Sequence, residues 1–243
     1  MTNIRYSWWH LNKILRVILD KRRNPWIFTL VIPVWYVYVD KNKKPILETA
    51  WTDAQRKWCR EFERLTELVL SKQYRIQATH RITKTRPRVG ARRTGALPSV
   101  RVFVDVIDLI AKAKQSSKVL GSKGIYVVIH PEEASGTAHA QVGGKTMEVK
   151  PSKLQYTYRD SKGRQKTRQQ RPAIHEVGHI IGYNHPVCSG NELRCYGEPG
   201  SEAYKSIMGA GMNVSVRAYQ PFADFLNRFE KGFKWQVRPQ RST

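Results

Sequence analysis

Long apolar stretches are missing from this chain of 243 residues. The longest, residues 26–39, contains Pro33 and is too short to cross a bilayer as a helix, so we expect no transmembrane segment. Its aromatic and β-branched residues predict a buried strand instead. The N-terminus also lacks the pattern of a cleavable signal peptide. Two locations therefore stay open: the cytoplasm, and export by a route that needs no such signal.

Cysteine is scarce too, because the chain has only Cys59, Cys188 and Cys195. Their spacing fits no cysteine-based zinc site. Cys188 and Cys195 bracket a short loop and could close a disulfide there, whereas Cys59 falls in a predicted helix. The odd total leaves the redox compartment open.

Acidic residues are few, with 19 Asp and Glu against 43 Lys and Arg, which gives a net charge of +24. The basic residues are densest at residues 84–93 and 159–171, which are rich in polar or turn-forming residues and predict exposed loops. Such a field attracts a polyanion, such as nucleic acid or anionic lipid, or an acidic protein partner. A basic surface that is merely solvated is the alternative.

Eleven residues in the C-terminal third carry the strongest signal, because they read H-E-x-x-H-x-x-G-x-x-H. On a helix, His175 and His179 project from one face and can hold a single zinc ion. Glu176 lies roughly 100° round the helix from His175, where it can hold a metal-bound water without being a ligand. Gly182 permits a left-handed turn that ends the helix and returns His185 as the third ligand.

An ordinary packed helix is the alternative, since a lone histidine on a helix is usually a polar or packed residue. Here three histidines, a glutamate and a glycine fall in register, and Ile174, Val177 and Ile181 make the opposite face apolar. The pattern therefore favours zinc. The same residues would also be present in a protein that binds zinc without turnover.

The motif resembles that of the metzincin clan of zinc endopeptidases. A second likeness lies at Met208, within Ser-Ile-Met-Gly, where metzincins have a methionine turn beneath the zinc ligands. Pro186, directly after the third histidine, is similar to the serralysin branch. Serralysins and astacins carry a tyrosine two residues after the methionine that helps to hold the metal or the oxyanion, whereas this chain has Ala210. The calcium-binding glycine repeats of serralysins are also missing, so the subfamily stays open.

The pattern along the rest of the chain predicts an α+β fold. Residues 4–23 have the apolar stripe of a basic amphipathic helix. The other expected elements are a helix over residues 48–74, strands over 73–82, 100–107 and 124–129, a hairpin of 135–142 with 145–150, the motif helix, and a final helix over 221–231.

The resemblance implies a two-lobed metzincin-like domain. Its parts would be an N-terminal helix in residues 1–25, an upper lobe in 26–182 and a small lower lobe in 183–243. The upper lobe would hold a twisted, mostly parallel sheet with an antiparallel edge strand, a backing helix and the active-site helix. The lower lobe would hold the third zinc ligand, the methionine turn and the C-terminal helix.

The family also implies where substrate lies, because its extended substrate pairs with the antiparallel edge strand above the zinc. The order of elements places Thr137, Ala138, His139 and Ala140 in that strand, and an ordinary surface hairpin is the alternative. We therefore expect a zinc endopeptidase acting on a protein or peptide, with Glu176 as general base. Rival expectations are a DNA-associated protease, an exported toxin or effector metalloprotease, and a non-catalytic zinc-binding protein.

Overall fold

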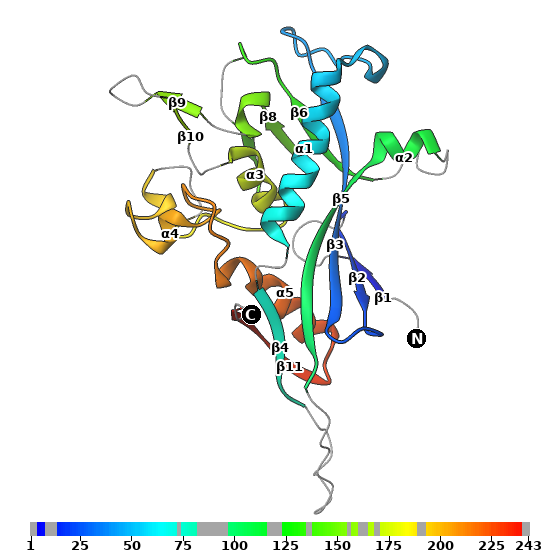
Figure 1. The fold of residues 1–243 in the computed structure, drawn as a ribbon, viewed down its shortest axis with the longest axis vertical. Helices are drawn as coiled ribbons and strands as arrows, with labels where there is room; N and C mark the ends of the chain where they lie inside the picture. Colours follow the sequence, from blue (N-terminus) through cyan, green and yellow to red (C-terminus); the bar gives the residue numbers. More distant parts are fainter. Residues whose placement is uncertain are drawn as a thin grey trace, which may run out of the picture.

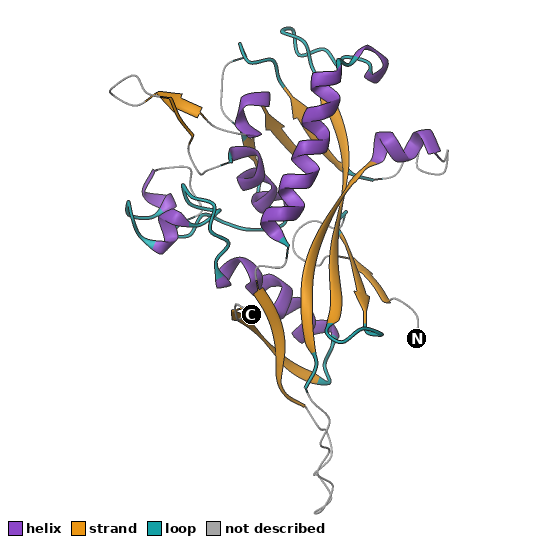
Figure 2. Ribbon diagram, in the orientation of Figure 1, coloured by secondary structure: helices purple, strands orange, loops and turns teal. Residues whose placement is uncertain are grey.

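The chain folds into helices packed on one large mixed sheet, as shown by a computed structural model (Figure 1). The structure describes residues 4–7, 14–71, 74–81, 97–115, 123–134, 138–154, 157–159, 165–167, 171–188 and 193–239. The α+β class expected from the sequence is confirmed (Figure 2). No helix within these ranges is long and apolar enough to cross a membrane.

The main sheet has parallel pairings at its centre and antiparallel pairings towards both ends. Its strands, in spatial order, are β11 (Phe233–Pro239), β4 (Tyr74–Arg81), β5 (Ser99–Asp108), β3 (Trp26–Tyr38), β6 (Ile125–Ile129), β8 (Thr146–Val149) and β7 (His139–Ala140). The predicted antiparallel edge strand is confirmed as β7, which pairs with β8 alone among the described strands. The expectation of a mostly parallel sheet is right only for the centre.

The predicted N-terminal helix is wrong. The segment instead contributes strands β1 (Ile4–Ser7) and β2 (Arg16–Asp20), which pair with each other, and β2 pairs with β3. In β2, Val17 and Leu19 are fully buried while their neighbours are not. This two-residue alternation suits a strand, and pairing with the long strand β3 outweighs the helical spacing of apolar residues.

The helices predicted over residues 48–74 and 221–231 are present but span residues 53–70 and 216–229, and those at 109–115 and 202–205 were not predicted. The described residues form five α-helices. They are α1 (Asp53–Leu70), α2 (Leu109–Gln115), α3 (Pro172–Ile180), α4 (Glu202–Lys205) and α5 (Val216–Phe229), with 3-10 turns η1 (Glu48–Ala50), η3 (Pro151–Leu154) and η4 (Leu193–Tyr196). The start of α1 is fixed by a capping box, in which Thr52 and Gln55 each bond the other's backbone N–H. A separate two-stranded ribbon contains β9 (Thr157–Arg159) and β10 (Gln165–Thr167).

One face of the sheet is covered by α1 and α5, and we call it the helix face. On it, the ring of Phe62 in α1 lies 6.1 Å from that of Tyr36 in β3, and Phe222 and Phe225 of α5 meet Phe28 edge-on. Helix α3 lies beside α1 and also contacts β7 and β8. The sheet therefore holds the motif helix at the end where its edge strand lies.

The C-terminal part of the chain enters the main sheet, because β11 follows α5 and pairs with β4. This strand was not predicted. Trp235 of β11 is 1% exposed, lies 5.4 Å from Trp26 between ring centroids, and donates its indole N–H to the Glu230 carbonyl. The segment expected as a small lower lobe thus also completes the sheet of the upper part.

Replacing Trp235 by Ala should lower the free energy of unfolding by about 3–5 kcal/mol, because it empties a large buried site. Lys234→Ala, an exposed position on the same strand, is the matched control and should change it by less than about 0.5 kcal/mol. Urea unfolding followed by tryptophan fluorescence and far-UV circular dichroism measures both. Equal effects of the two substitutions would contradict a structural role for β11.

Candidate metal centre

Helix α3 supplies two of the three motif histidines and is almost wholly buried. Pro172 occupies its first turn, as predicted, where a missing N–H costs nothing. The helix ends as the motif requires: Gly182 has φ of 102°, and the N–H of Tyr183 bonds the carbonyl of Gly178 at 2.9 Å. This turn reverses the chain and brings His185 back beside α3.

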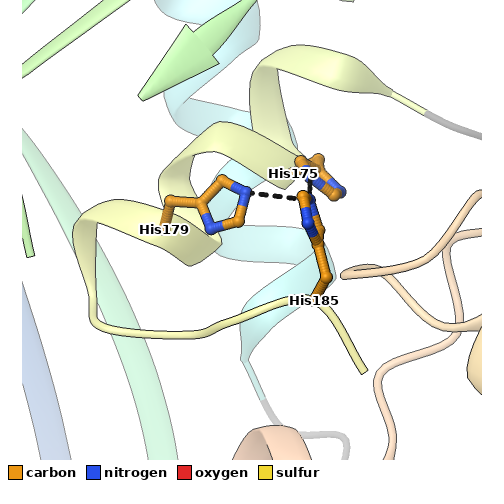
Figure 3. A group of neighbouring side chains, drawn as sticks. All are labelled: His175, His179 and His185. Atoms are coloured by element: carbon orange, nitrogen blue, oxygen red, sulfur yellow. Dashed lines mark hydrogen bonds between the residues drawn. The ribbon is translucent and has the colours of Figure 1, made fainter. Parts of the chain in front are cut away.

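The three imidazoles converge on one point (Figure 3). The Nε2 atoms of His175 and His179 lie 3.1 and 3.2 Å from Nε2 of His185. In a tetrahedral site with metal–nitrogen bonds of about 2.0–2.1 Å, ligand atoms are about 3.3 Å apart. The spacing of the imidazole nitrogens therefore fits a single metal ion bound by three ligands.

Two backbone carbonyls fix which nitrogen of each helix histidine faces the centre. Nδ1 of His175 lies 2.7 Å from the carbonyl oxygen of Ile207, and Nδ1 of His179 lies 2.8 Å from that of Tyr183. A carbonyl only accepts, so each Nδ1 carries the proton and each Nε2 keeps a lone pair. Three nitrogens then meet with at most one proton, on His185, between them. A cation would be bound by these lone pairs. The N–H groups on the far side of the two helix histidines then bond backbone carbonyls, as is usual for histidines that bind a metal.

Burial also keeps the two helix histidines neutral. It lowers the pKa of His175 to about 3, helped by the neighbouring His179, and lowers the pKa of His179 as well. A neutral imidazole is the form that binds a metal. Both side chains are thus held ready as ligands at neutral pH.

Met208 lies directly under the metal helix, as the resemblance implies. A Cβ added to Gly178, the residue directly before His179, would come 2.2 Å from the sulfur of Met208. The glycine at this x position of the motif therefore lets the methionine turn pack against the backbone of α3. Ser206 shapes the turn by accepting the N–H of Gly209 at 3.1 Å.

Glu176 is buried in α3 directly after the first histidine of the cluster. Its carboxyl group is not part of the three-residue metal cluster found among the described residues. Burial raises the pKa of Glu176 to about 8, opposed by a backbone hydrogen bond from Ala140. A metal ion held by the imidazoles would lower that pKa again by attraction, leaving a carboxylate beside the ion.

Tyr196 is the residue of this site that the sequence patterns missed. Its ring packs on His185, with centroids 4.3 Å apart, and lies 5.8 Å from the ring of His175 at an angle of 22°. Burial raises the pKa of Tyr196, and the nearby charge of Glu176 adds to the rise. No motif predicts it, because η4 follows the third histidine across a loop whose path the sequence does not fix. The residue immediately before it, a cysteine in the predicted disulfide, was the only available signal.

The predicted disulfide between Cys188 and Cys195 is present, with a Cα–Cα distance of 4.8 Å. The N–H of Val187 also bonds the carbonyl of Cys195 at 3.2 Å. Both links tie η4 to the segment that follows His185. Tyr196 is thereby anchored next to the third ligand.

The expected substrate strand is described only in part. Thr137 lies outside the described residues, while Ala138 is buried and His139 and Ala140 form β7, at the end of the sheet. The strand lies next to α3, because the N–H of Gly143, in the turn between β7 and β8, bonds the carbonyl of His179 at 2.7 Å. The edge strand therefore lies beside the metal centre, with the Ala140 backbone directed at Glu176.

A cavity of about 240 Å³ lies next to the third ligand. Its lining includes Gly182, His185, Met208, Ser215, Arg217 and Pro221. Residues 84–93 of the first basic cluster, and most of residues 159–171 of the second, lie outside the described residues. Of the second cluster, the structure describes Arg159 in β9, residues 165–167 in β10 and Arg171 directly before α3, so this part of the predicted loop is a two-stranded ribbon.

Comparison with protein-family models, with curated proteins and with solved structures finds no match for this chain. The chemistry of the site therefore has to be inferred from its geometry. What the structure shows directly is a cluster of three histidines that could hold a metal ion.

The protein should bind one divalent metal per chain, and His179→Ala should lower the affinity by more than the ~10–100-fold that losing an outer partner costs. His139→Ala, an exposed histidine of β7 outside the cluster, should leave affinity unchanged. Competition titrations of metal-stripped protein with Zn²⁺ and Co²⁺ against a chelator provide the measurement. Retained affinity in His179→Ala would show that the metal binds elsewhere.

Proposed function

We propose that the chain is a zinc-dependent endopeptidase with a metzincin-like site. The observation that carries the proposal is the convergence of three Nε2 atoms beside a buried glutamate that is not itself a ligand. Three neutral imidazoles suit zinc and leave its fourth position for water. The two-lobed arrangement, with substrate between sheet edge and methionine turn, is part of the same proposal.

Zinc bound at this site would supply a water molecule of lowered pKa and would polarise the scissile carbonyl. Glu176 accepts the proton of that water and passes it to the leaving amine. The buried setting of this carboxylate raises its pKa and so favours uptake of the proton. His175 and His179 stay fixed by their carbonyl partners throughout, so the ligand geometry needs no reorganisation.

Substrate would run along β7, whose outer edge has no partner strand among the described residues. Main-chain hydrogen bonds to an edge strand bind an extended peptide with little demand on its sequence. The cavity beside His185 would receive one substrate side chain next to the cleaved bond. These contacts would place the scissile carbonyl over the metal from both sides.

Tyr196 would donate its hydroxyl proton to the oxyanion that forms on the scissile carbonyl. Its ring lies on His185, and the charge of Glu176 contributes to its raised pKa. Tyr196 would thus supply the hydrogen-bond donor that the side chain of Ala210, two residues after Met208, cannot supply. Because its pKa is raised, the hydroxyl keeps its proton at neutral pH, which is the form that donates.

Glu176→Gln tests the base. It keeps the size of the side chain and all three imidazoles, so metal content should match that of the wild type, whereas peptide hydrolysis should fall by at least ~10²-fold. Cleavage of a quenched fluorescent peptide library, with metal measured by elemental analysis, gives both values. Full turnover by a metal-loaded Glu176→Gln protein would remove the glutamate from its proposed role, and an inactive metal-loaded wild type would favour a non-catalytic binding protein.

Tyr196→Phe tests the oxyanion donor. The ring that packs on His185 stays, so metal affinity and KM should change by less than about twofold, while kcat should fall by roughly 10–10³-fold, as when one such donor is removed. Tyr204→Phe, at a half-buried tyrosine of α4, is the matched control. A proportional loss of metal and of activity would mean that Tyr196 only supports the ligands.

A further inference from the structure

The face of the sheet opposite the helix face carries a row of arginines. Arg238 of β11 is the cross-strand partner of Arg75 of β4, and Arg75 is the partner of Arg101 of β5. The residues next to them in sequence, Ile76 and Val100, are fully buried on the helix face. Because side chains alternate along a strand, the three arginines all project from the other face. We call these three residues the arginine row.

The arginine row is costly in the isolated chain. Neighbouring strands are about 4.8 Å apart, so three like charges stand side by side, and like charges directly opposite destabilise a sheet. In addition, the Nε atoms of Arg75 and Arg101 are shielded from water and have no hydrogen-bond partner among the described residues. An unmet donor of this kind costs free energy that an acceptor would recover.

The surroundings of the row offer amides and a hydroxyl group, together with one carboxylate that is already paired. The next row on the same face is formed by Gln236, Gln77 and Ser99, which are also paired across the strands. Arg238 donates to the side chain of Gln236 at 3.3 Å. Beyond Arg101 on this face, the paired residues are Ile27 and then Asp20, whose carboxylate is bound by Arg22. The described part of this patch therefore contains no internal counter-ion for the row.

We propose that the arginine row binds the phosphate backbone of nucleic acid. A guanidinium group can form a bidentate pair of hydrogen bonds with a phosphate. If the side chain of Arg75 or Arg101 extended towards the solvent, its unbonded Nε–H could donate to a phosphate oxygen. A line of three charges suits a linear polymer of regularly repeated anions better than the irregular carboxylates of a protein surface.

The site is separate from the metal centre. Strands β11, β4 and β5 form one end of the sheet, whereas β7, which contacts the motif helix α3, forms the other end. Binding of nucleic acid would therefore need neither the metal nor the proposed peptidase activity. Its role would be to localise the protein on a nucleic acid while the metal centre stays open to another substrate.

The test uses the full chain and fluorescein-labelled 20-mers of single-stranded and duplex DNA, with binding followed by anisotropy over a series of salt concentrations. Substituting Arg75, Arg101 and Arg238 together by Gln should weaken binding at least ~10-fold. The slope of log K against log salt should become shallower by about 0.7 per lost contact on single strands and about 0.9 on duplex. The matched control replaces Lys57, Arg60 and Arg64, three exposed basic residues of α1, by Gln and removes the same charge from elsewhere.

The result that overturns the proposal is equal weakening by the two triple variants, or no change in the salt slope of the arginine-row variant. Binding of a polyglutamate peptide that exceeds binding of both DNAs and depends on the row would also overturn it, in favour of an acidic protein.

Arg238→Gln, a single change at an exposed position, gives a folded variant that should lose one contact even if the triple variant is unstable. The double variant Arg75→Lys, Arg101→Lys keeps both charges but loses the planar guanidinium groups. It should bind DNA more tightly than the Gln variant and more weakly than the wild type. Hydrolysis of peptide by the arginine-row variant should equal that of the wild type, so this experiment and the tests of the peptidase can fail independently.

Discussion

The metal centre depends on the contact between helix α3 and the turn that carries Met208. His175 donates through Nδ1 to the carbonyl of Ile207, and the sulfur of Met208 fills the space left by Gly178. Neither contact exists within the helix itself, because the partners are some thirty positions apart in sequence. The direction of the first ligand is therefore set by the tertiary fold, and any movement of the turn would move the imidazole with it.

The ligands could be predicted from the sequence because their geometry is local. Residues four apart on a helix share a face, and the positive φ at Gly182 returns the chain within a few residues. Strand β3 and helix α1 were equally accessible, since their apolar spacing is long and regular. Tyr196 could not be found in this way. Its place on His185 results from a loop and a disulfide, and no repeated spacing records either of them.

The two errors at the ends of the chain have one physical cause. The segments that became β2 and β11 are short, and each is a strand because a partner strand lies beside it. Residues 16–20 fit a helical stripe as well as an alternating one, and only the pairing with β3 decides between them. Likewise, the aromatic residues of β11 have no clear period until Trp235 meets Trp26 across the core. Non-local pairing is information that a single segment does not contain.

The pairing of β11 with β4 also orders events during synthesis. Strand β4 is made early, but its outer edge has no partner until α5 and β11 have both left the ribosome. Until then β4 presents a row of unsatisfied backbone groups, the kind of edge on which chains aggregate. At alternate positions on the uncovered face, β4 carries Arg75 and Gln77 rather than apolar residues. The charge that distinguishes that face thus also protects the half-made sheet from pairing with another chain.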